Sequence, residues 1–125
     1  MARAPHIGVV MIVEDDKETA SGLAEILEIL GYHSEIAENG ETALTRLREA
    51  PSGYCLVILD VMMPVMDGWD FLTEHRRDEA LANIPVVVVT AAVDAHAKAA
   101  NTGAVAVLPK PLDTVKLSAT VRQYC

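Results

Sequence analysis

The run from Cys55 to Leu59, together with the Asp60 that follows it, constrains the fold of this chain more than any other feature. Five apolar residues stand in sequence, and a carboxylate and a loop containing Pro64 follow them directly. A short apolar run bounded by turn signals is typical of a strand that is buried on both faces. Asp60 is therefore predicted to lie where a central strand leaves the core.

Four further segments have the character of strands. Residues 7–13 and 86–90 are almost wholly apolar, residues 32–37 alternate as an edge strand would, and residues 104–108 form a short fifth strand. Apolar residues at helical spacing, or helix propensity, predict helices between and after the strands. These predicted helices are residues 17–30, 41–49, 69–78 with a cap near Asp67 or Gly68, 95–102 and 112–124.

The regular alternation of strands and helices predicts an α/β fold. Alternation of this kind gives a parallel sheet with right-handed crossovers and helices on both faces. We expect a doubly wound, five-stranded sheet in the order 2-1-3-4-5. A chain of 125 residues fits one domain, so residues 1–125 are interpreted as a single domain with its core at about 7–124 and no separate output domain.

Charge and hydropathy argue against two classes of partner. A net charge of −8 does not suit a nucleic-acid groove, because phosphate binding needs clustered Lys and Arg. No apolar stretch approaches the roughly 18 residues that a membrane-spanning helix needs, and no signal segment is evident at the start. We therefore expect a soluble, cytoplasmic protein that binds neither nucleic acid nor membrane.

The cysteines and histidines show no metal-binding pattern. Cys55 and Cys125 are interpreted as one core thiol and one exposed thiol at the end of the chain, with no disulfide framework. The four histidines are scattered over different elements and are predicted to be surface residues: His6, His33, His75 and His96. A metal site built from soft or nitrogen ligands is therefore not expected.

Polar residues stand at the ends of four predicted strands. They are Glu14, Asp15 and Asp16 after the first strand, Asp60 after the third, Thr90 at the end of the fourth, and Lys110 after the fifth. In a doubly wound sheet, ligands bind outside the carboxyl ends of the strands, where the strand order reverses between the first and third strands. Residues scattered in the sequence are therefore predicted to form one cluster in space.

The chemistry of this cluster points to phosphoryl transfer. Clustered carboxylates repel one another and remain stable as anions only if a cation joins them. Oxygen ligands without His or Cys indicate a hard ion, and Mg²⁺ is the usual one where phosphate chemistry also occurs. Mg²⁺ and Lys110 would counter the charge on a phosphoryl group, leaving Asp60 able to attack it as a nucleophile. The cluster therefore suggests aspartyl-phosphate chemistry.

Taken in order, these motifs resemble the receiver domain of bacterial two-component response regulators, including the chemotaxis regulators. The motifs are Glu14-Asp15-Asp16, Asp60 with Met63-Pro64 and Asp67-Gly68, Thr90-Ala91, and Lys110-Pro111. The resemblance extends over residues 7–124 and implies a flavodoxin-like (βα)5 fold. It also implies that Asp60 accepts a phosphoryl group from a histidine kinase or a histidine phosphotransfer protein.

The resemblance assigns the metal ligands. Asp15 and Asp60 would bind Mg²⁺ directly, with Mn²⁺ as the alternative ion, and the backbone carbonyl of Met62 would be a further ligand. Glu14 would act through a bound water. Asp16 lies one place beyond the usual acidic pair and is given a minor role.

The resemblance also assigns the residues that would contact the phosphoryl group. At one position the sequence differs from the usual family pattern. Thr90 would hydrogen-bond a phosphoryl oxygen, Lys110 would pair with it, and the Lys110–Pro111 bond is suggested to be cis. The family often carries Tyr or Phe three residues before the lysine, and Val107 stands there in this chain. Gating by an aromatic ring is therefore in doubt, whereas phosphoryl acceptance is not.

The resulting prediction is a signalling phosphoacceptor rather than an enzyme. Phosphorylation would switch the binding of a downstream protein through the predicted helix 95–102, strand 104–108 and helix 112–124. One alternative is an interaction module that keeps the fold without phosphorylation. A less favoured alternative is an aspartyl-phosphate phosphatase, because Met62 occupies the position where such enzymes usually carry a general acid.

Overall fold

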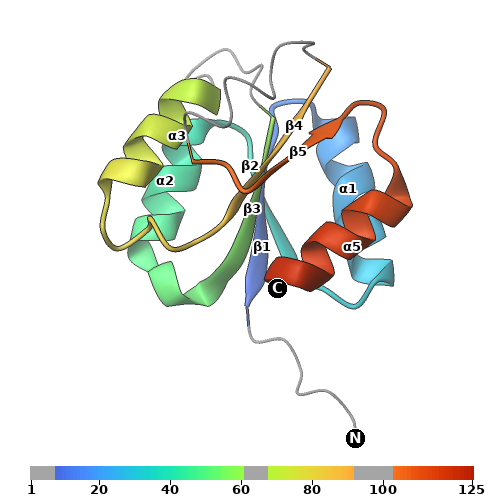
Figure 1. The fold of residues 1–125 in the computed structure, drawn as a ribbon, viewed down its shortest axis with the longest axis horizontal. Coiled ribbons are helices and arrows are strands. Elements are labelled where there is room, and N and C mark those ends of the chain that lie inside the picture. Colours follow the sequence, from blue (N-terminus) through green and yellow to red (C-terminus); the bar gives the residue numbers. More distant parts are fainter. Residues whose placement is uncertain (1–7, 61–67, 92–102) are drawn as a thin grey trace, which may run out of the picture.

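A computed structural model describes residues 8–60, 68–91 and 103–125, and Figure 1 shows its fold. Five strands form one parallel sheet in the order β2-β1-β3-β4-β5. The strands are β1 Val9–Val13, β2 Ser34–Ala37, β3 Tyr54–Asp60, β4 Val86–Thr90 and β5 Ala106–Pro109. The predicted doubly wound order is confirmed, with the alternating segment β2 at one edge of the sheet.

Helices cover both faces of the sheet. In Figure 1, α2 and α3 lie on one side of the sheet, and α1 and α5 lie on the other. The helices are α1 Lys17–Ile29, α2 Gly40–Glu49, α3 Gly68–Arg77 and α5 Thr114–Tyr124, with a short 3-10 helix at Pro51–Gly53. The helix predicted at 95–102 lies outside the described residues. In the described part of the chain, no helix has the length and apolar character needed to cross a membrane.

Capping side chains set the first residues of the helices. The Asp16 carboxylate accepts a hydrogen bond from the Thr19 amide at 3.3 Å, and Asn39 Oδ1 accepts one from the Thr42 amide at 2.8 Å. Asp113 caps α5 in the same way, which is why this helix begins two residues later than the predicted 112. Predicted and observed elements therefore differ mainly at their ends.

Alternate residues of the central strands pack into two apolar clusters, one on each face of the sheet. Leu59 is wholly buried in the cluster that includes Phe71 of α3. Its neighbour Ile58 points the other way, into the cluster that includes Leu27 of α1 and Leu117 of α5. Burial on both faces explains why β3 reads as a continuous apolar run.

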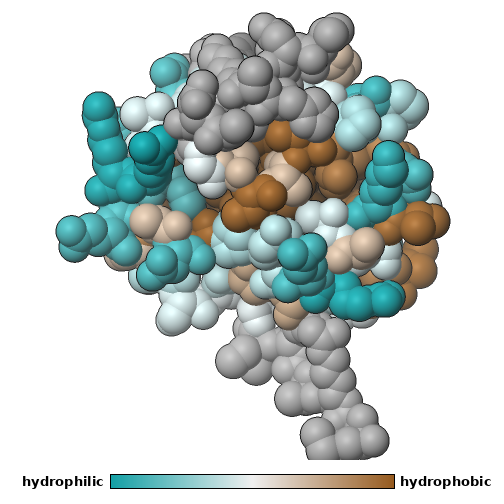
Figure 2. All heavy atoms as spheres, viewed as in Figure 1, coloured by the Kyte–Doolittle hydropathy of each residue, from teal (hydrophilic) through white to brown (hydrophobic). Residues whose placement is uncertain are grey.

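The surface differs between the sides of the molecule. In Figure 2, hydrophilic side chains cover the side formed by α2 and α3, whereas hydrophobic side chains reach the surface near the middle of the view, over β4 and β5. Val105, which precedes β5, is 42% exposed. The β5 edge of the sheet is thus the less polar part of this face, as far as the described residues show it.

The interpretation of the two cysteines as separate thiols is wrong. Cys55 and Cys125 are joined by a disulfide, with Cα atoms 5.2 Å apart and 70 residues between them in the sequence. The end of α5 returns to the start of β3, and this proximity is set by the packing of the helix rather than by any local pattern. Cysteine spacing alone therefore could not show the bond.

The prediction that His75 is a surface residue is also wrong. His75 lies on the inner side of α3, is only 5% exposed, and stacks against Phe71 with ring centroids 6.0 Å apart. Burial lowers the pKa of His75, because the charged form loses its hydration. His33 is exposed as predicted, whereas His6 and His96 lie outside the described residues.

Candidate functional site

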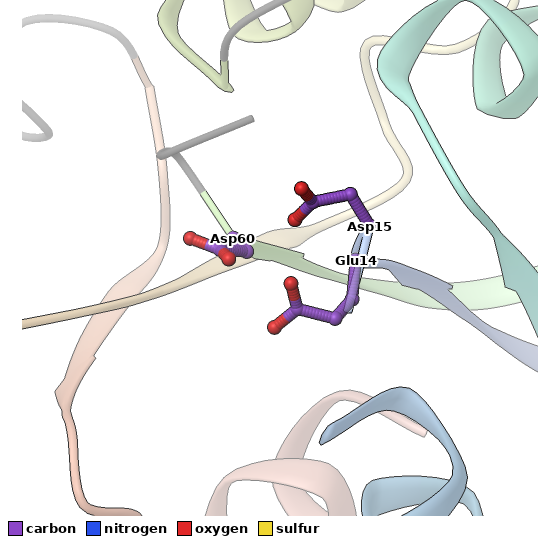
Figure 3. A group of neighbouring side chains, drawn as sticks. All are labelled: Glu14, Asp15 and Asp60. Carbon is purple, nitrogen blue, oxygen red and sulfur yellow. The ribbon is translucent and has the colours of Figure 1, made fainter. Parts of the chain in front are cut away.

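The carboxyl ends of β1 and β3 bring three carboxylates together. Val13 and Leu59 are partners in the parallel ladder, so the residues that follow them, Glu14 and Asp60, leave the sheet side by side. Figure 3 shows the side chains of Glu14, Asp15 and Asp60 gathered at this edge. Each offers a carboxylate oxygen, and the three oxygens all lie within 4.8 Å of one another. The predicted acidic cluster is therefore present.

Lys110 reaches this cluster from the other side of β4. Its Nζ lies 3.4 Å from Glu14 Oε1 and 3.4 Å from Asp60 Oδ2. The backbone positions it, because the Lys110 amide donates a hydrogen bond to the Thr90 carbonyl at 3.1 Å, directly after β4 and β5 end as partners. One ammonium group thus neutralises part of the charge of two buried acids.

Burial divides the acidic residues into two kinds. Glu14 and Asp60 are 5% and 7% exposed, which is close to the burial of the core, whereas Asp15 is exposed. Thr90 is 2% exposed at the end of β4, the strand between Asp60 and Lys110. The candidate site therefore has three buried side chains, Glu14, Asp60 and Thr90, which we call the buried floor, and one exposed side chain, Asp15.

The electrostatics of the buried floor favour a proton or a cation. The pKa of Glu14 is raised to about 7, first by burial and then by the hydrogen bond and repulsion from Asp60, which together outweigh the lowering by Lys110. Burial alone would lower the pKa of Lys110, but attraction to Asp60 and Glu14 outweighs it, so the pKa is raised and the ammonium form is stabilised. A divalent cation at this site would take over the role of the proton on Glu14.

The residues present fit a hard divalent cation. Carboxylate oxygens are the donors that Mg²⁺ prefers, and Glu14, Asp15 and Asp60 supply three within one small volume. Asp16 is directed elsewhere, since its carboxylate accepts hydrogen bonds from both the amide and the hydroxyl of Thr19. Met62, whose carbonyl was predicted as a further ligand, lies outside the described residues.

The structure also describes two features near the end of β5 that the resemblance to the family singled out, the Lys110–Pro111 bond and Val107. The Lys110–Pro111 peptide bond is cis, as the resemblance suggested. Val107 pairs with Val88 of β4 and packs, half-buried, against the apolar cluster on the α2 and α3 side. The position that often carries an aromatic ring thus holds a small apolar side chain that is already part of the core packing.

The sequence did not predict two features of the site, one ion pair and one pocket. It paired Lys110 with a phosphoryl group but did not foresee the ion pair between Lys110 and Glu14. It also missed a pocket of about 270 Å³ beside the cluster, whose lining includes Asp15, Lys17 and Arg46. Arg46 comes from α2, and only the packing of that helix brings it near; no sequence signal could have found it.

Comparison with known proteins gives a family match over most of the chain. The family model of the response regulator receiver domain matches residues 10–122. The transcriptional regulatory protein CpxR homolog of Haemophilus influenzae is 37% identical over 115 residues, which cover 90% of this chain and 48% of that protein. A response regulator receiver protein of Anaeromyxobacter is 38% identical over 102 residues, or 82% of this chain and 42% of the relative. The chain thus spans about half the length of these curated relatives.

Solved structures give the same fold. The chemotaxis protein CheY4 of Vibrio cholerae superposes with a TM-score of 0.85 at 25% identity, covering 96% of this chain and all of that one (100%). The receiver domain of a signal transduction histidine kinase from Syntrophus aciditrophicus gives a TM-score of 0.85 at 33% identity, covering 94% and 89% of the two chains. The predicted flavodoxin-like fold is confirmed by these neighbours.

Proposed function

Because this chain belongs to the response regulator receiver domain family, we propose that Asp60 accepts a phosphoryl group and that the domain acts as a phosphorylation-controlled switch. The observation that carries the proposal is the convergence at the sheet edge. Asp60 Oδ2 lies 3.4 Å from the Lys110 ammonium, and Asp60 shares a cluster of carboxylate oxygens with Glu14 and Asp15. A strand-end carboxylate without a function would need neither.

In this proposal each buried group has a task in the transfer. A carboxylate oxygen of Asp60 attacks the phosphorus, the new O–P bond forms, and the bond from phosphorus to the donor atom breaks. Lys110, which already lies against Asp60, then pairs with the phosphoryl oxygens, and the Thr90 hydroxyl donates to one of them. Glu14 keeps Lys110 at the site throughout, because the two side chains form an ion pair.

We propose that the acidic cluster holds Mg²⁺, with Mn²⁺ as an alternative. Asp15 and Asp60 would be direct ligands, Glu14 would act through a bound water, and the Met62 carbonyl remains a prediction outside the described residues. When bound, the ion supplies positive charge that offsets repulsion between the carboxylates and the phosphoryl oxygens. The support for this proposal is the oxygen-only donor set together with the raised pKa of Glu14.

The proposed donor is a phosphohistidine of a histidine kinase or a phosphotransfer protein. Relatives named as transcriptional regulatory proteins, and a structural neighbour named as a chemotaxis protein, support a place in two-component signalling. The downstream partner would bind at β5 and α5, together with the predicted helix 95–102, which lies outside the described residues. Since Val107 replaces the aromatic ring, we propose that Thr90 and Lys110 carry the switch without it.

The two alternative functions are less well supported. A module that has lost the chemistry would not need to keep Glu14 and Asp60 buried beside one lysine, an arrangement that destabilises the fold unless charge is compensated. Receiver domains are signalling modules rather than ordinary enzymes. A phosphatase would need a general acid, and the position two residues beyond Asp60 is Met62.

Phosphorylation of the purified chain tests the proposal. Wild-type protein incubated with acetyl phosphate and Mg²⁺ should gain the mass of one phosphoryl group, and removal of Mg²⁺ with a chelator should prevent the gain. Asp60→Asn should gain none, because an amide oxygen is a poor nucleophile. Asp70→Asn, which alters an exposed acid of α3, is the matched control and should behave as wild type. Equal gain in Asp60→Asn would refute the assignment.

A further inference from the structure

The disulfide lies at the opposite end of the sheet from the acidic cluster. Cys55 is the second residue of β3, whereas Asp60 is its last, so the two are separated by about 16 Å along the strand. Cys125 follows the last turn of α5, and Figure 1 shows this end of the helix beside the lower part of the sheet. The Cα separation of 5.2 Å lies within the range of ordinary disulfides. The pair is therefore a second chemical feature, distinct from the phosphoryl site.

The sheet makes local room for this bond. Val9 of β1 is the partner of Tyr54, but the next residue, Val10, is the partner of Leu56, so Cys55 falls at a shift in the register. Such irregularities re-aim a side chain relative to a regular strand. Cys55 can thus present its sulfur to the end of α5.

Gly8 contributes to the same arrangement. A Cβ atom at position 8 would lie 2.7 Å from the Cβ of Cys55, closer than real Cβ atoms approach, and a tight 3.1 Å from its Sγ. By contrast, a Cβ at Gly22 of α1 would meet nothing within 4 Å. The space beside Cys55 therefore depends on glycine at position 8.

We propose that Cys55 and Cys125 are a reversible redox modification site that fastens the end of α5 to the sheet. Both residues pack against the α1 and α5 cluster but remain partly exposed, so a small thiol reagent can reach them. This proposal goes beyond phosphoryl acceptance and does not depend on it. The oxidant we name is a low-molecular-weight disulfide of the glutathione class.

The reaction is two successive thiol–disulfide exchanges. One cysteine thiolate attacks the small disulfide, forming a mixed disulfide and releasing one small thiolate. The second cysteine thiolate then attacks the mixed disulfide, forming the Cys55–Cys125 bond and releasing the other. In total the two protein thiols lose two electrons and two protons, and one small disulfide becomes two small thiols.

Closing the bond constrains the long stretch of chain between the two cysteines. Because a cross-link over 70 residues removes many conformations of the unfolded chain, the oxidised form should be the more stable one. We expect the melting temperature of the reduced protein to be lower by about 10 °C. Amide exchange in the last turns of α5 should also be faster after reduction, because the end of the helix is then held only by packing.

The test uses the full chain equilibrated in mixtures of oxidised and reduced glutathione. Free thiols are titrated after denaturation in acid, and a digest under non-reducing conditions should contain one peptide pair linking Cys55 to Cys125. Excess reduced glutathione should return both thiols. Cys125→Ser, at the end of the helix, tests the effect on stability with the least disturbance of the core, and its melting temperature should not respond to the glutathione ratio.

Several results would overturn the proposal. Two free thiols at every glutathione ratio would mean that the bond does not form, and a disulfide between two chains would mean that it forms elsewhere. A bond that excess reduced glutathione cannot open would make it structural rather than reversible. Asp60→Asn serves as the control for independence, since it should form the bond as wild type does even though it accepts no phosphoryl group.

Discussion

The interior of the sheet and its carboxyl edge are buried to nearly the same depth but contain opposite kinds of residues. Leu59 is wholly buried in an apolar cluster, and the next residue, Asp60, is only 7% exposed beside another acid and a lysine. Val88 and Thr90 repeat the contrast on β4, at 0% and 2% exposure. Burial thus stabilises the fold in one region and costs stability in the other.

This contrast explains how one strand serves both the fold and the site. Apolar burial contributes roughly 1.5–3 kcal/mol for each large side chain, whereas a buried charge lowers stability unless it is paired. Lys110 compensates only part of the charge of Glu14 and Asp60, and the pKa of Glu14 is raised by burial and, in addition, by Asp60. In the proposed function, a cation and a phosphoryl group would supply and use the charge that this edge leaves uncompensated.

The largest expected effect is a difference in the free energy of unfolding between substitutions at two neighbouring residues of β3. Leu59→Ala should lower the free energy of unfolding by about 2–5 kcal/mol, because it leaves a cavity in the core. Asp60→Asn should leave that free energy unchanged or raise it slightly, because it removes one charge from a repelling cluster. Denaturant unfolding in the absence of divalent ions measures both. A large destabilisation by Asp60→Asn would show that Asp60 supports the fold rather than the function.

The pH dependence of the free energy of unfolding tests the carboxyl edge of the sheet without the interior, through Glu14. The pKa of Glu14 is raised from 4.5 to about 7 in the folded protein, so the folded state binds the Glu14 proton more tightly than the unfolded state. Stability should therefore fall as pH rises from about 4.5 to about 7, by about 1–3 kcal/mol from this group. Glu14→Gln should remove this part of the pH dependence. Urea unfolding in metal-free buffer is the measurement, and an identical slope in the variant would contradict the account.

Addition of Mg²⁺ should reverse the cost of the clustered acids. An ion that binds only the folded state raises the melting temperature, and at a given concentration the rise is larger for tighter binding. Asp15→Asn should bind Mg²⁺ about tenfold more weakly, or about 1.4 kcal/mol, because a charged ligand is lost. Asp16→Asn is the matched control, since Asn keeps the helix cap. Equal Mg²⁺ responses in both variants would exclude Asp15 as a ligand.

The smallest expected effect on stability is at the start of α2, where the capping residue supports the fold and has no proposed role in the site. Asn39→Ala should destabilise the protein by about 1 kcal/mol, because Asn39 Oδ1 accepts a 2.8 Å hydrogen bond from the Thr42 amide at the start of α2. Asn39→Asp keeps the acceptor and should cost less. Phosphoryl acceptance, measured by intact mass, should stay as in wild type for both. A loss of acceptance would mean that fold and site are coupled through α2.

The sequence predicts the strands and the strand-end cluster for one physical reason. A strand buried on both faces must be apolar, so the point where its apolar run stops marks the edge of the sheet, and the polar residue found there is Asp60 on β3 and Glu14 on β1. Parallel strands then bring such ends together without any further information. The roles given to Asp15, Thr90 and Lys110 in binding remain proposals.

The features that the sequence could not predict depend on packing between distant elements. The Cys55–Cys125 bond requires that α5 return to the start of β3, and the burial of His75 depends on which side of α3 faces the sheet. The ion pair of Lys110 with Glu14 joins the ends of β5 and β1, which have β3 and β4 between them. No local pattern encodes these distances.

The most direct test of the central claim is chemical identification of the phosphorylated residue. Wild-type protein is phosphorylated with acetyl phosphate and Mg²⁺, reduced with borohydride, which converts an aspartyl phosphate to homoserine, and digested for peptide sequencing. We predict homoserine at position 60 and unchanged aspartate at positions 15 and 16. Homoserine at another position, or a phosphoryl group that yields no homoserine, would contradict the assignment of Asp60 as the acceptor.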